Sequence, residues 1–225
     1  MIDIIRDYGQ SFLLPAMLQT LILSLYGLMF ACITGLIFGI LSVMRNRACR
    51  IIARIFVDVI RGIPLIVLAF FIFFGLPYGF NNILGIRFTI SALNAGIASL
   101  ALNCGAYMAE IIRAGIQSVD PGQMEAARSL GLPYGRAMRK VVLPQAIRTM
   151  IPSIINQFII TLKDTSILSA IGFPELVNKA KNVIAITGKS LQTWAVVALM
   201  YLIVIVLLSY LSKIVERRMS YGRKS

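Results

Sequence analysis

Long uncharged segments alternate with shorter charged ones along the whole chain. Residues 10–44, 62–86, 88–109 and 190–212 contain no charged side chain, and residues 149–172 form a similar segment that includes Lys163 and Asp164. Each segment reaches the roughly 20 residues that a helix needs to cross a hydrocarbon core of about 30 Å. We therefore predict an all-α membrane protein, one domain over residues 1–225 with five transmembrane helices. The predicted helices span about residues 12–43, 55–77, 88–112, 149–171 and 191–213, and a polar loop, 114–147, joins the third to the fourth.

Composition favours a membrane environment. With 58% hydrophobic residues and a mean hydropathy of +0.84, the chain carries more apolar surface than a soluble domain of this size buries. The first apolar run is longer than the about 7–15 residues of a signal-peptide core, and Asp3 and Asp7 precede it, so we expect it to be retained as a helix. Within it, Gly35 and Gly39 form a GxxxG pair, which we interpret as a point of close helix packing.

Basic residues are distributed unevenly between the two sides of the predicted bundle. Sixteen of the 22 Lys and Arg residues fall in segments 45–61, 113–148 and 213–224, which five spans place on one side. Because basic loops stay in the cytoplasm, we predict an extracytoplasmic N-terminus and a cytoplasmic C-terminus. This topology accounts for the net charge of +13. A nucleic-acid-binding face would interleave basic residues with aromatic ones, whereas here the basic residues lie at helix ends, so we expect no nucleic-acid partner.

Side chains suited to catalysis or metal binding are few. The chain has no His, and its three cysteines, Cys32, Cys49 and Cys104, lack the spacing of a metal site or a disulfide framework. We interpret the cysteines as small packing residues. The sequence therefore predicts no catalytic residue and no metal site.

Polar side chains in two of the predicted spans recur at helical spacing. Asn103, Tyr107 and Glu110 follow i, i+4, i+7 spacing and so share one stripe of the third helix. Four polar residues of the fourth helix are also expected on one face: Asn156, Gln157, Lys163 and Asp164. These two stripes predict the wall of a substrate pathway.

Depth in the bilayer separates the polar residues of the fourth helix. At about 1.5 Å per residue, Asn156 and Gln157 lie near the midplane, and Lys163 and Asp164 lie in the outer half. Polar side chains there usually face a partner or a water-filled cavity. The alternative is structural: Lys163 would reach outward with Asp164 as its neutralising partner, and the two amides would join neighbouring helices. Both interpretations stay open.

The polar loop between the third and fourth helices has helical signals of its own. An Asp-Pro-Gly turn at 120–122 can cap a helix over residues 123–130, and Gly131 can end that helix in a left-handed conformation. A second short helix is expected at about 134–142, ending near Pro144 because residues before proline avoid the α region. The loop would then project compactly into the cytoplasm; otherwise it would lie as an amphipathic segment on the inner lipid headgroups.

A group of residues in the same loop carries a resemblance to a known family: Glu125, Ala126, Ala127, Ser129, Leu130, Gly131, Leu143 and Pro144. With these residues the loop resembles the coupling loop of ABC-type import permeases. Further matches lie at residues 61–65 (RGIPL), 105–116 (GAYMAEIIRAGI) and 162–166 (LKDTS), and the last of these adds Thr165 and Ser166 to the implied substrate pathway. Over essentially its whole length, the chain resembles the membrane-spanning subunits of polar amino-acid ABC importers, the family of histidine, glutamine, arginine and cystine permeases.

This resemblance implies a multi-pass protein of a prokaryotic plasma membrane, in contact with lipid, that imports a polar amino acid by alternating access. The implied partners are two cytoplasmic ATPases, a second copy of the chain or a paralogue, and an extracytoplasmic substrate-binding protein. The chain has no G-x-x-x-x-G-K-[ST] loop, so ATP and Mg²⁺ would be bound by the ATPase and this chain would not be an enzyme. Similar permeases for cationic substrates often have an acidic residue in place of Gln157, so we expect a polar neutral or cystine-like substrate.

Two other classes of membrane protein are alternatives. A secondary amino-acid transporter driven by an ion gradient would use Glu110, Lys163 and Asp164 as an ion relay, but the internal repeats that favour this class are not found. A receptor-like or structural membrane protein would not need two polar stripes within its helices.

Overall fold

The computed structural model describes residues 2–220, with side-chain surroundings for residues 2–214, and this part of the chain is helical with no β-strand. Five helices are long and apolar enough to cross a membrane: Ile2–Val43, Leu65–Ile83, Ala92–Gln117, Tyr134–Ile171 and Ser190–Ile214. The prediction of an all-α chain with five such helices is confirmed. In the predicted cytoplasmic tail, Arg223 and Lys224 lie outside the described residues, and so do the side chains of Arg217 and Arg218.

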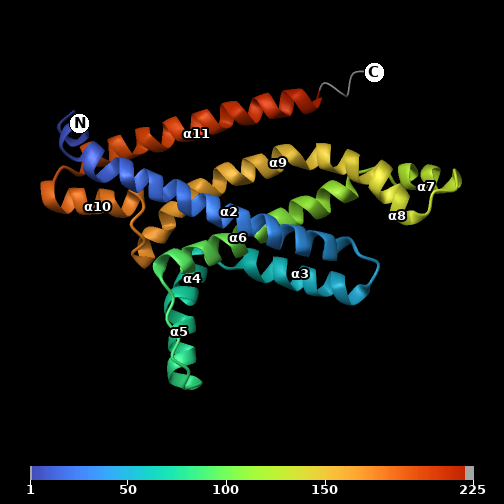
Figure 1. The fold of residues 1–225 in the computed structure, drawn as a ribbon, viewed down its shortest axis with the longest axis horizontal. Coiled ribbons are helices and arrows are strands. Elements are labelled where there is room, and N and C mark those ends of the chain that lie inside the picture. Colours follow the sequence, from blue (N-terminus) through green and yellow to red (C-terminus); the bar gives the residue numbers. More distant parts are fainter. Residues whose placement is uncertain (1, 221–225) are drawn as a thin grey trace.

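The first long helix runs without a break from the N-terminal end of the described chain. Its parts are α1 (Ile2–Ile4), the π-helical segment η1 (Ile5–Leu13) and α2 (Leu14–Val43). The chain then turns and returns beside α2 as α3 (Arg47–Gly62) (Figure 1). The Asn46 side chain caps α3 by accepting a hydrogen bond from the Ala48 N–H at 2.9 Å.

Helix α6 (Ala92–Gln117) is the most buried of the five apolar helices and packs along α2. The glycines of α2 allow this contact: a Cβ atom on Gly35 would lie 2.6 Å from the Met108 Cβ, and one on Gly39 would lie 2.9 Å from the Ile112 Cβ. Side chains at these positions would force the two backbones apart. The predicted close packing at Gly35 and Gly39 is confirmed.

The second predicted helix, 55–77, is divided in the structure. Helix α3 ends at Gly62, Ile63 and Pro64 have extended backbone, and α4 (Leu65–Phe70) starts a new helix. A residue before proline disfavours the α region, and Ile63 adopts an extended conformation that ends α3. Residues 55–62 therefore belong to α3, and the second apolar helix begins at Leu65 rather than near residue 55.

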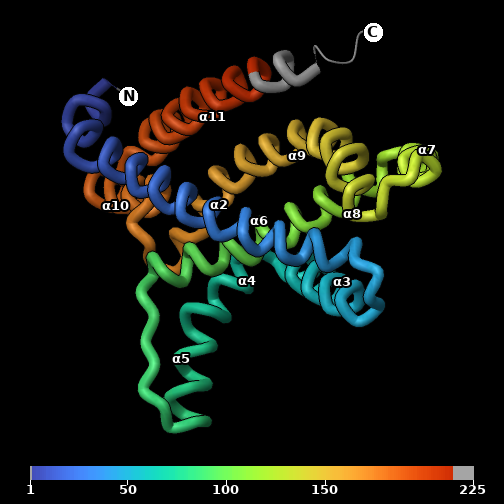
Figure 2. The backbone as a smooth tube through the Cα atoms, turned by 45° about the vertical axis from the view of Figure 1, so that its right-hand side comes forward, coloured from blue at the N-terminus to red at the C-terminus, as the bar shows by residue number. Residues whose placement is uncertain are grey.

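This second apolar helix continues past its predicted end at Pro77 and projects away from the other helices (Figure 2). It passes from α4 through η2 (Phe71–Gly75), α5 (Leu76–Tyr78) and η3 (Gly79–Ile83). Pro77 falls in the first turn of α5, directly after a π-helical segment that closes with a bond from the Leu76 N–H to the Phe71 carbonyl. The backbone is thus already paired in a π-helical pattern just before Pro77, and the continuous helix accommodates a residue without an N–H there.

Four elements follow α6: α7 (Pro121–Ser129), α8 (Tyr134–Ala137), the π-helical segment η4 (Met138–Val142) and α9 (Leu143–Asp164). The last three form one continuous helix, so the predicted end near Pro144 is wrong. Pro144 lies just after the π-helical segment η4, which closes with a bond from the Leu143 N–H to the Met138 carbonyl, so the continuous helix accommodates a residue without an N–H.

The chain closes with three further elements. They are the 3-10 helix η5 (Thr165–Ile171), α10 (Leu176–Thr187) and α11 (Ser190–Ser220). In Figure 1, α10 and the N-terminus lie at one end of the molecule, which we call the α10 end. The turn between α2 and α3 lies with α7 and α8 at the opposite end, which we call the α7 end.

Candidate functional site

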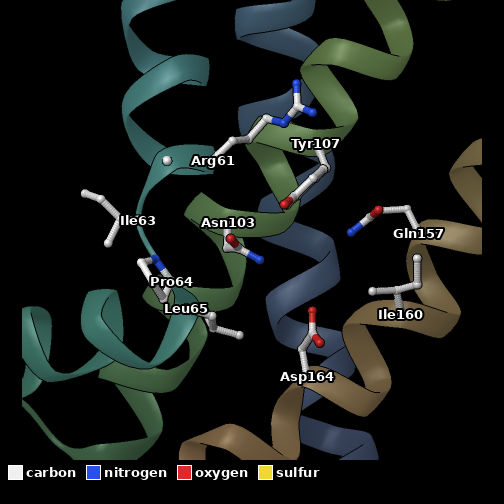
Figure 3. A pocket seen from close by; sticks show the side chains of 10 residues that line it. Arg61, Ile63, Pro64, Leu65, Asn103, Tyr107, Gln157, Ile160 and Asp164 are labelled. Carbon is white, nitrogen blue, oxygen red and sulfur yellow. The ribbon is translucent and has the colours of Figure 1, made fainter.

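A cavity of about 490 Å³ lies between α3, α4, α6 and α9 (Figure 3). Ten residues line this central cavity: Arg61, Gly62, Ile63, Pro64, Leu65, Asn103, Tyr107, Gln157, Ile160 and Asp164. Its volume is within the range of about 300–1,000 Å³ that is usual for small-molecule sites. Four residues of the predicted substrate pathway are thus brought together, two from α6 and two from α9.

The polar side chains of these four residues point into the central cavity. Figure 3 shows Asn103 and Tyr107 on α6 opposite Gln157 and Asp164 on α9. Asn103 is 8% exposed and Gln157 is 7% exposed. Buried amides need hydrogen-bond partners, and these two have donors and acceptors directed at the same space. The cavity can therefore bind a small polar molecule.

The residue spacing along α9 decides which of its polar side chains reach the cavity. Gln157 and Asp164 are seven residues apart, which at about 100° per residue brings them to nearly the same angle. Asn156 and Lys163 have the same spacing but lie one residue earlier, so they are rotated away, and both are exposed outside the cavity. The prediction that all four polar residues share one face of α9 is therefore wrong.

Arg61 is a cavity residue that the polar stripes did not predict. It is the second-last residue of α3, and its guanidinium carbon lies 5.0 Å from the centre of the Tyr107 ring, a cation–π contact. In Figure 3, Arg61 and Asp164 lie on opposite sides of the cavity. The available signal was the Arg-Gly-Ile-Pro sequence at 61–64, which ends α3 and turns the chain beside α6.

The other predicted pathway residues serve different contacts. Glu110 accepts a hydrogen bond from the Arg113 Nε at 3.0 Å and lies outside the central cavity. The Thr165 hydroxyl donates to the Leu162 carbonyl at 2.7 Å, and the Ser166 hydroxyl donates to the Lys163 carbonyl at 2.7 Å. These two hydroxyls satisfy carbonyl groups at the end of α9, where an α-helix leaves its last carbonyls unpaired.

The loop between α6 and α9 folds as its sequence predicts at its first helix. The Asp120 side chain caps α7 by accepting a hydrogen bond from the Gly122 N–H at 2.8 Å. Gly131 has a φ of +82°, and the Gly131 and Leu132 N–H groups donate to the carbonyls of Arg128 and Ala127 at 3.0 and 3.2 Å. This pair of bonds is the Schellman motif that ends a helix with a left-handed glycine.

The faces of this loop differ in exposure. Glu125, Ala126, Ser129 and Leu130 are exposed, Ala127 is buried, Leu143 is intermediate and Pro144 is exposed. The Leu130 side chain is 85% exposed although it is apolar.

Two contacts hold the loop at the α7 end. The Arg45 guanidinium carbon lies 4.6 Å from the centre of the Tyr134 ring, and the Gln145 amide donates to the Gln123 side chain at 3.2 Å. The loop therefore contacts both the α2–α3 turn and the start of α9.

Candidate metal ligands are scattered through the part of the chain that the structure describes. Among the described residues, no group of three or more His, Cys, Asp or Glu could hold a metal ion. Cys32, Cys49 and Cys104 each have a free thiol.

Comparison with known proteins identifies the family. The family of binding-protein-dependent transport system inner membrane components matches residues 27–221. A glutamine transport system permease protein of Escherichia coli (strain K12) is 37% identical over 201 residues, which cover 89% of this chain and 90% of that protein. A putative glutamine transport system permease protein of Rickettsia felis is 35% identical over 208 residues, covering 92% of this chain and 93% of that protein.

Solved structures show the same relationship. A chain in the crystal structure of an amino acid ABC transporter with histidines is 36% identical and has a TM-score of 0.84, covering 92% of this chain and 93% of that chain. A structure of the inward-facing MetNI methionine ABC transporter has a TM-score of 0.74 at 20% identity, covering 92% of this chain and 95% of that chain, which shows a shared fold.

The family match extends over most of the chain, and two independent relatives exceed one third identity over nearly their whole length. Together with five apolar helices, this family makes the chain a multi-pass inner-membrane protein of bacteria. The chain belongs to the binding-protein-dependent transport system inner membrane components and is a permease subunit of an ABC transporter.

Proposed function

We propose that this permease imports a polar, uncharged amino acid such as glutamine through the central cavity, in a complex driven by ATP. The observation that carries the proposal is the placement of one guanidinium, one carboxylate and two amides around a single cavity. The names of the relatives from Escherichia coli and Rickettsia felis, both glutamine permeases, agree with this substrate class.

The charges of the central cavity complement those of a free amino acid. Arg61 can bind the substrate carboxylate, because a guanidinium forms two parallel hydrogen bonds with a carboxylate. Asp164, on the other side of the cavity, can accept hydrogen bonds from the substrate ammonium group. Asn103 and Gln157 are then left for the substrate side chain. An amide or another uncharged polar group suits these two residues, because they offer both donors and acceptors without a net charge.

We further propose that the loop at the α7 end couples the permease to its ATPase. Its exposed residues Glu125, Ala126, Ser129 and Leu130 combine one charge, one hydroxyl and an apolar tip, which suits a groove on a protein partner. Helix α9 is continuous with α8 and η4, and α7 contacts both of these segments. A displacement of α7 can therefore be transmitted along one continuous helix to Gln157 and Asp164 in the central cavity. Such a displacement would change how tightly the cavity binds the substrate, and alternating access requires different affinities in the outward and inward states.

The proposed complex contains two ATPase subunits that bind ATP and Mg²⁺, a second permease copy or a paralogue, and an extracytoplasmic binding protein. In this complex the α7 end faces the cytoplasm and the N-terminus lies outside. The distribution of basic residues supports this orientation, since Arg45 and Arg136 are at the α7 end. Fewer basic side chains, such as Lys181, occur toward the α10 end.

The test is reconstitution of the permease with its ATPase and binding protein in lipid vesicles. Uptake of glutamine, cystine, arginine and glutamate is measured under three conditions: ATP inside the vesicles, ATP outside them, and no ATP. The binding protein is saturated with substrate in each measurement. We expect uptake that needs ATP on the ATPase side and that is fastest for glutamine or cystine. Fastest uptake of arginine or glutamate would refute the proposed substrate class.

The same vesicles test the alternative of an ion-driven transporter. The charges that such a relay requires are separated, because Glu110 pairs with Arg113 while Lys163 is exposed. The family match gives this alternative no support. A proton or sodium gradient in the absence of ATP should therefore produce no uptake.

A further inference from the structure

A second cavity, of about 430 Å³, lies between α2, α3 and α6, beside the central cavity. Its charged lining residues are Arg50, Arg54, Asp58, Arg61, Glu110 and Arg113. Four guanidinium groups against two carboxylates give this space a net positive charge. We call it the arginine cavity.

Arg61 joins the two cavities, because it lines both of them. Arg50, Arg54 and Arg61 are separated by four and seven residues, so they lie along one face of α3. Helix α3 extends from the central cavity toward the α7 end. The three guanidinium groups therefore form a line that begins at the central cavity and leads toward the end where the ATPase is proposed to bind.

The guanidinium groups differ in how far their hydrogen-bonding capacity is used. Arg113 donates to Glu110 at 3.0 Å and to Gln117 at 2.7 Å, and Arg50 donates to two backbone carbonyls between α2 and α3 at 3.0 Å. Arg54 has no hydrogen bond or ion pair with the part of the chain that the structure describes. Arg61 likewise has no such bond but lies over the Tyr107 ring, so Arg54 is the cation of this cavity that has no partner among the described residues and is available to a ligand.

We infer that the arginine cavity is the release-side compartment of the transport pathway, and that Arg54 binds the carboxylate of an amino acid that has left the central cavity. This inference rests on the proposed function of the central cavity as the amino-acid site. Its physical basis is that a carboxylate moving from Arg61 to Arg54, two cations that line the same cavity, remains next to a guanidinium throughout the step. Asp58 is available to the ammonium group in the same cavity, whereas Glu110 is paired with Arg113.

The contact between Arg61 and Tyr107 lies where the two cavities adjoin. The Tyr107 ring lines the central cavity, and the Arg61 guanidinium that lies over it borders both cavities. A cation–π contact at a partly exposed site is weak, so a bound carboxylate can compete for the guanidinium. Passage of the substrate between the two cavities then includes a rearrangement of the Arg61 side chain.

Cysteine protection tests for the ligand directly. Cys32, Cys49 and Cys104 are replaced by serine, and Ser42→Cys, which lines the arginine cavity, is modified with anionic or cationic methanethiosulfonate reagents in the purified complex. We expect faster modification by the anionic reagent, and slower modification when L-glutamine is present at saturation. The matched control is Ala48→Cys, an exposed position near the start of α3, whose modification L-glutamine should leave unchanged.

Two further probes identify what the cavity recognises. The decarboxylated analogue 4-aminobutanamide should not protect Ser42→Cys, because it lacks the group that Arg54 binds. Vesicles of phosphatidylglycerol and of phosphatidylcholine should give equal modification rates. Protection by phosphatidylglycerol but not by L-glutamine would overturn the inference and assign the cavity to an anionic lipid headgroup.

Transport kinetics test the role of Arg54. Arg54→Gln should lower the maximal rate of L-glutamine uptake by about tenfold, as expected for the loss of one hydrogen bond to a charged group, with KM little changed. It should also abolish the protection of Ser42→Cys. Arg47→Gln, on the same helix but outside the arginine cavity, is the matched control and should retain the parent rate. The inference would be refuted if Arg54→Gln took up L-glutamine at the parent rate and if L-glutamine did not protect Ser42→Cys in an otherwise active complex. A parent complex without ATP-dependent uptake would instead refute the proposed function.

Discussion

The Tyr201 hydroxyl donates a hydrogen bond to the Glu175 carboxylate across 3.3 Å, and this contact joins α11 to the start of α10. Glu175 is completely buried and also accepts hydrogen bonds from the Val177 and Asn178 N–H groups at 2.8 and 2.7 Å. A buried carboxylate with three donors acts as the N-cap of α10 and fixes this helix at the α10 end.

The buried Glu175 predicts a pH-dependent stability. Burial raises the pKa of Glu175, while the Val177 and Asn178 N–H groups lower it in part. Because the folded state binds the proton more tightly than the unfolded state, this contribution to stability is complete below the ordinary glutamate pKa of about 4.3 and is lost as the pH rises through the higher folded value. Glu175→Gln should flatten this dependence in thermal unfolding of the detergent-solubilised protein. An unchanged pH profile would contradict the assignment to Glu175.

Replacement of Gly35 should disturb the packing between α2 and α6. Gly35→Ala would place a Cβ atom 2.6 Å from the Met108 Cβ, and overpacking of this kind costs about 1–3 kcal/mol. The unfolding temperature should fall. Gly79→Ala is the matched control, since no heavy atom lies within 4 Å of its added Cβ, and it should leave the unfolding temperature nearly unchanged. Equal effects of the two variants would argue against close packing at Gly35.

Replacement of Gly131 should impair the coupling between this loop and the ATPase. A side chain at φ +82° costs about 1–2 kcal/mol, so Gly131→Val should distort the end of α7 and displace Glu125. We expect normal membrane insertion, but a loss of uptake and of ATPase stimulation by the binding protein. Gly135→Val is the control in α8, where no atom lies within 4 Å of an added Cβ. Full uptake by Gly131→Val with a stably bound ATPase would reject the coupling role of this loop.

The side chain at position 157 should influence which amino acids the permease transports. Gln157→Glu adds an anion to the central cavity at nearly constant volume, which should favour a cationic substrate side chain and disfavour an anionic one. We expect the ratio of arginine to glutamate uptake to rise by about tenfold, which corresponds to about 1.4 kcal/mol. Asn156→Asp adds the same charge one residue earlier, on the exposed face of α9, and should leave the ratio unchanged. If both variants keep the parent ranking, Gln157 is a packing residue.

The proposed orientation predicts the accessibility of the two ends. In a cysteine-free background, Arg136→Cys at the α7 end should react with an impermeant reagent only from the cytoplasmic side. Asn182→Cys on α10 should react only from outside. Both positions are exposed, so burial does not limit the reaction, and labelling of both from the same side would show that the topology is wrong.

Much of the fold follows from local sequence. Five apolar helices follow from the need to satisfy backbone groups in lipid, and the α7 cap and its left-handed end follow from Asp120 and Gly131, whose preferences act within a few residues. Proline was less predictable from sequence. Pro64 divides a helix, whereas Pro77 and Pro144 are accommodated next to π-helical segments that a local pattern does not predict.

The central cavity required the tertiary structure. Helical spacing identified Asn103, Tyr107, Gln157 and Asp164 as polar within apolar helices, but it could not determine which side of α9 faces α6, because that rotation is set by packing against other helices. The break at Ile63–Pro64 brings Arg61 beside Tyr107, a contact between residues 46 positions apart that no local preference specifies. The sequence by itself therefore determined the membrane helices and the family, whereas the tertiary structure decided which polar residues share a cavity, since only packing sets the rotation of each helix.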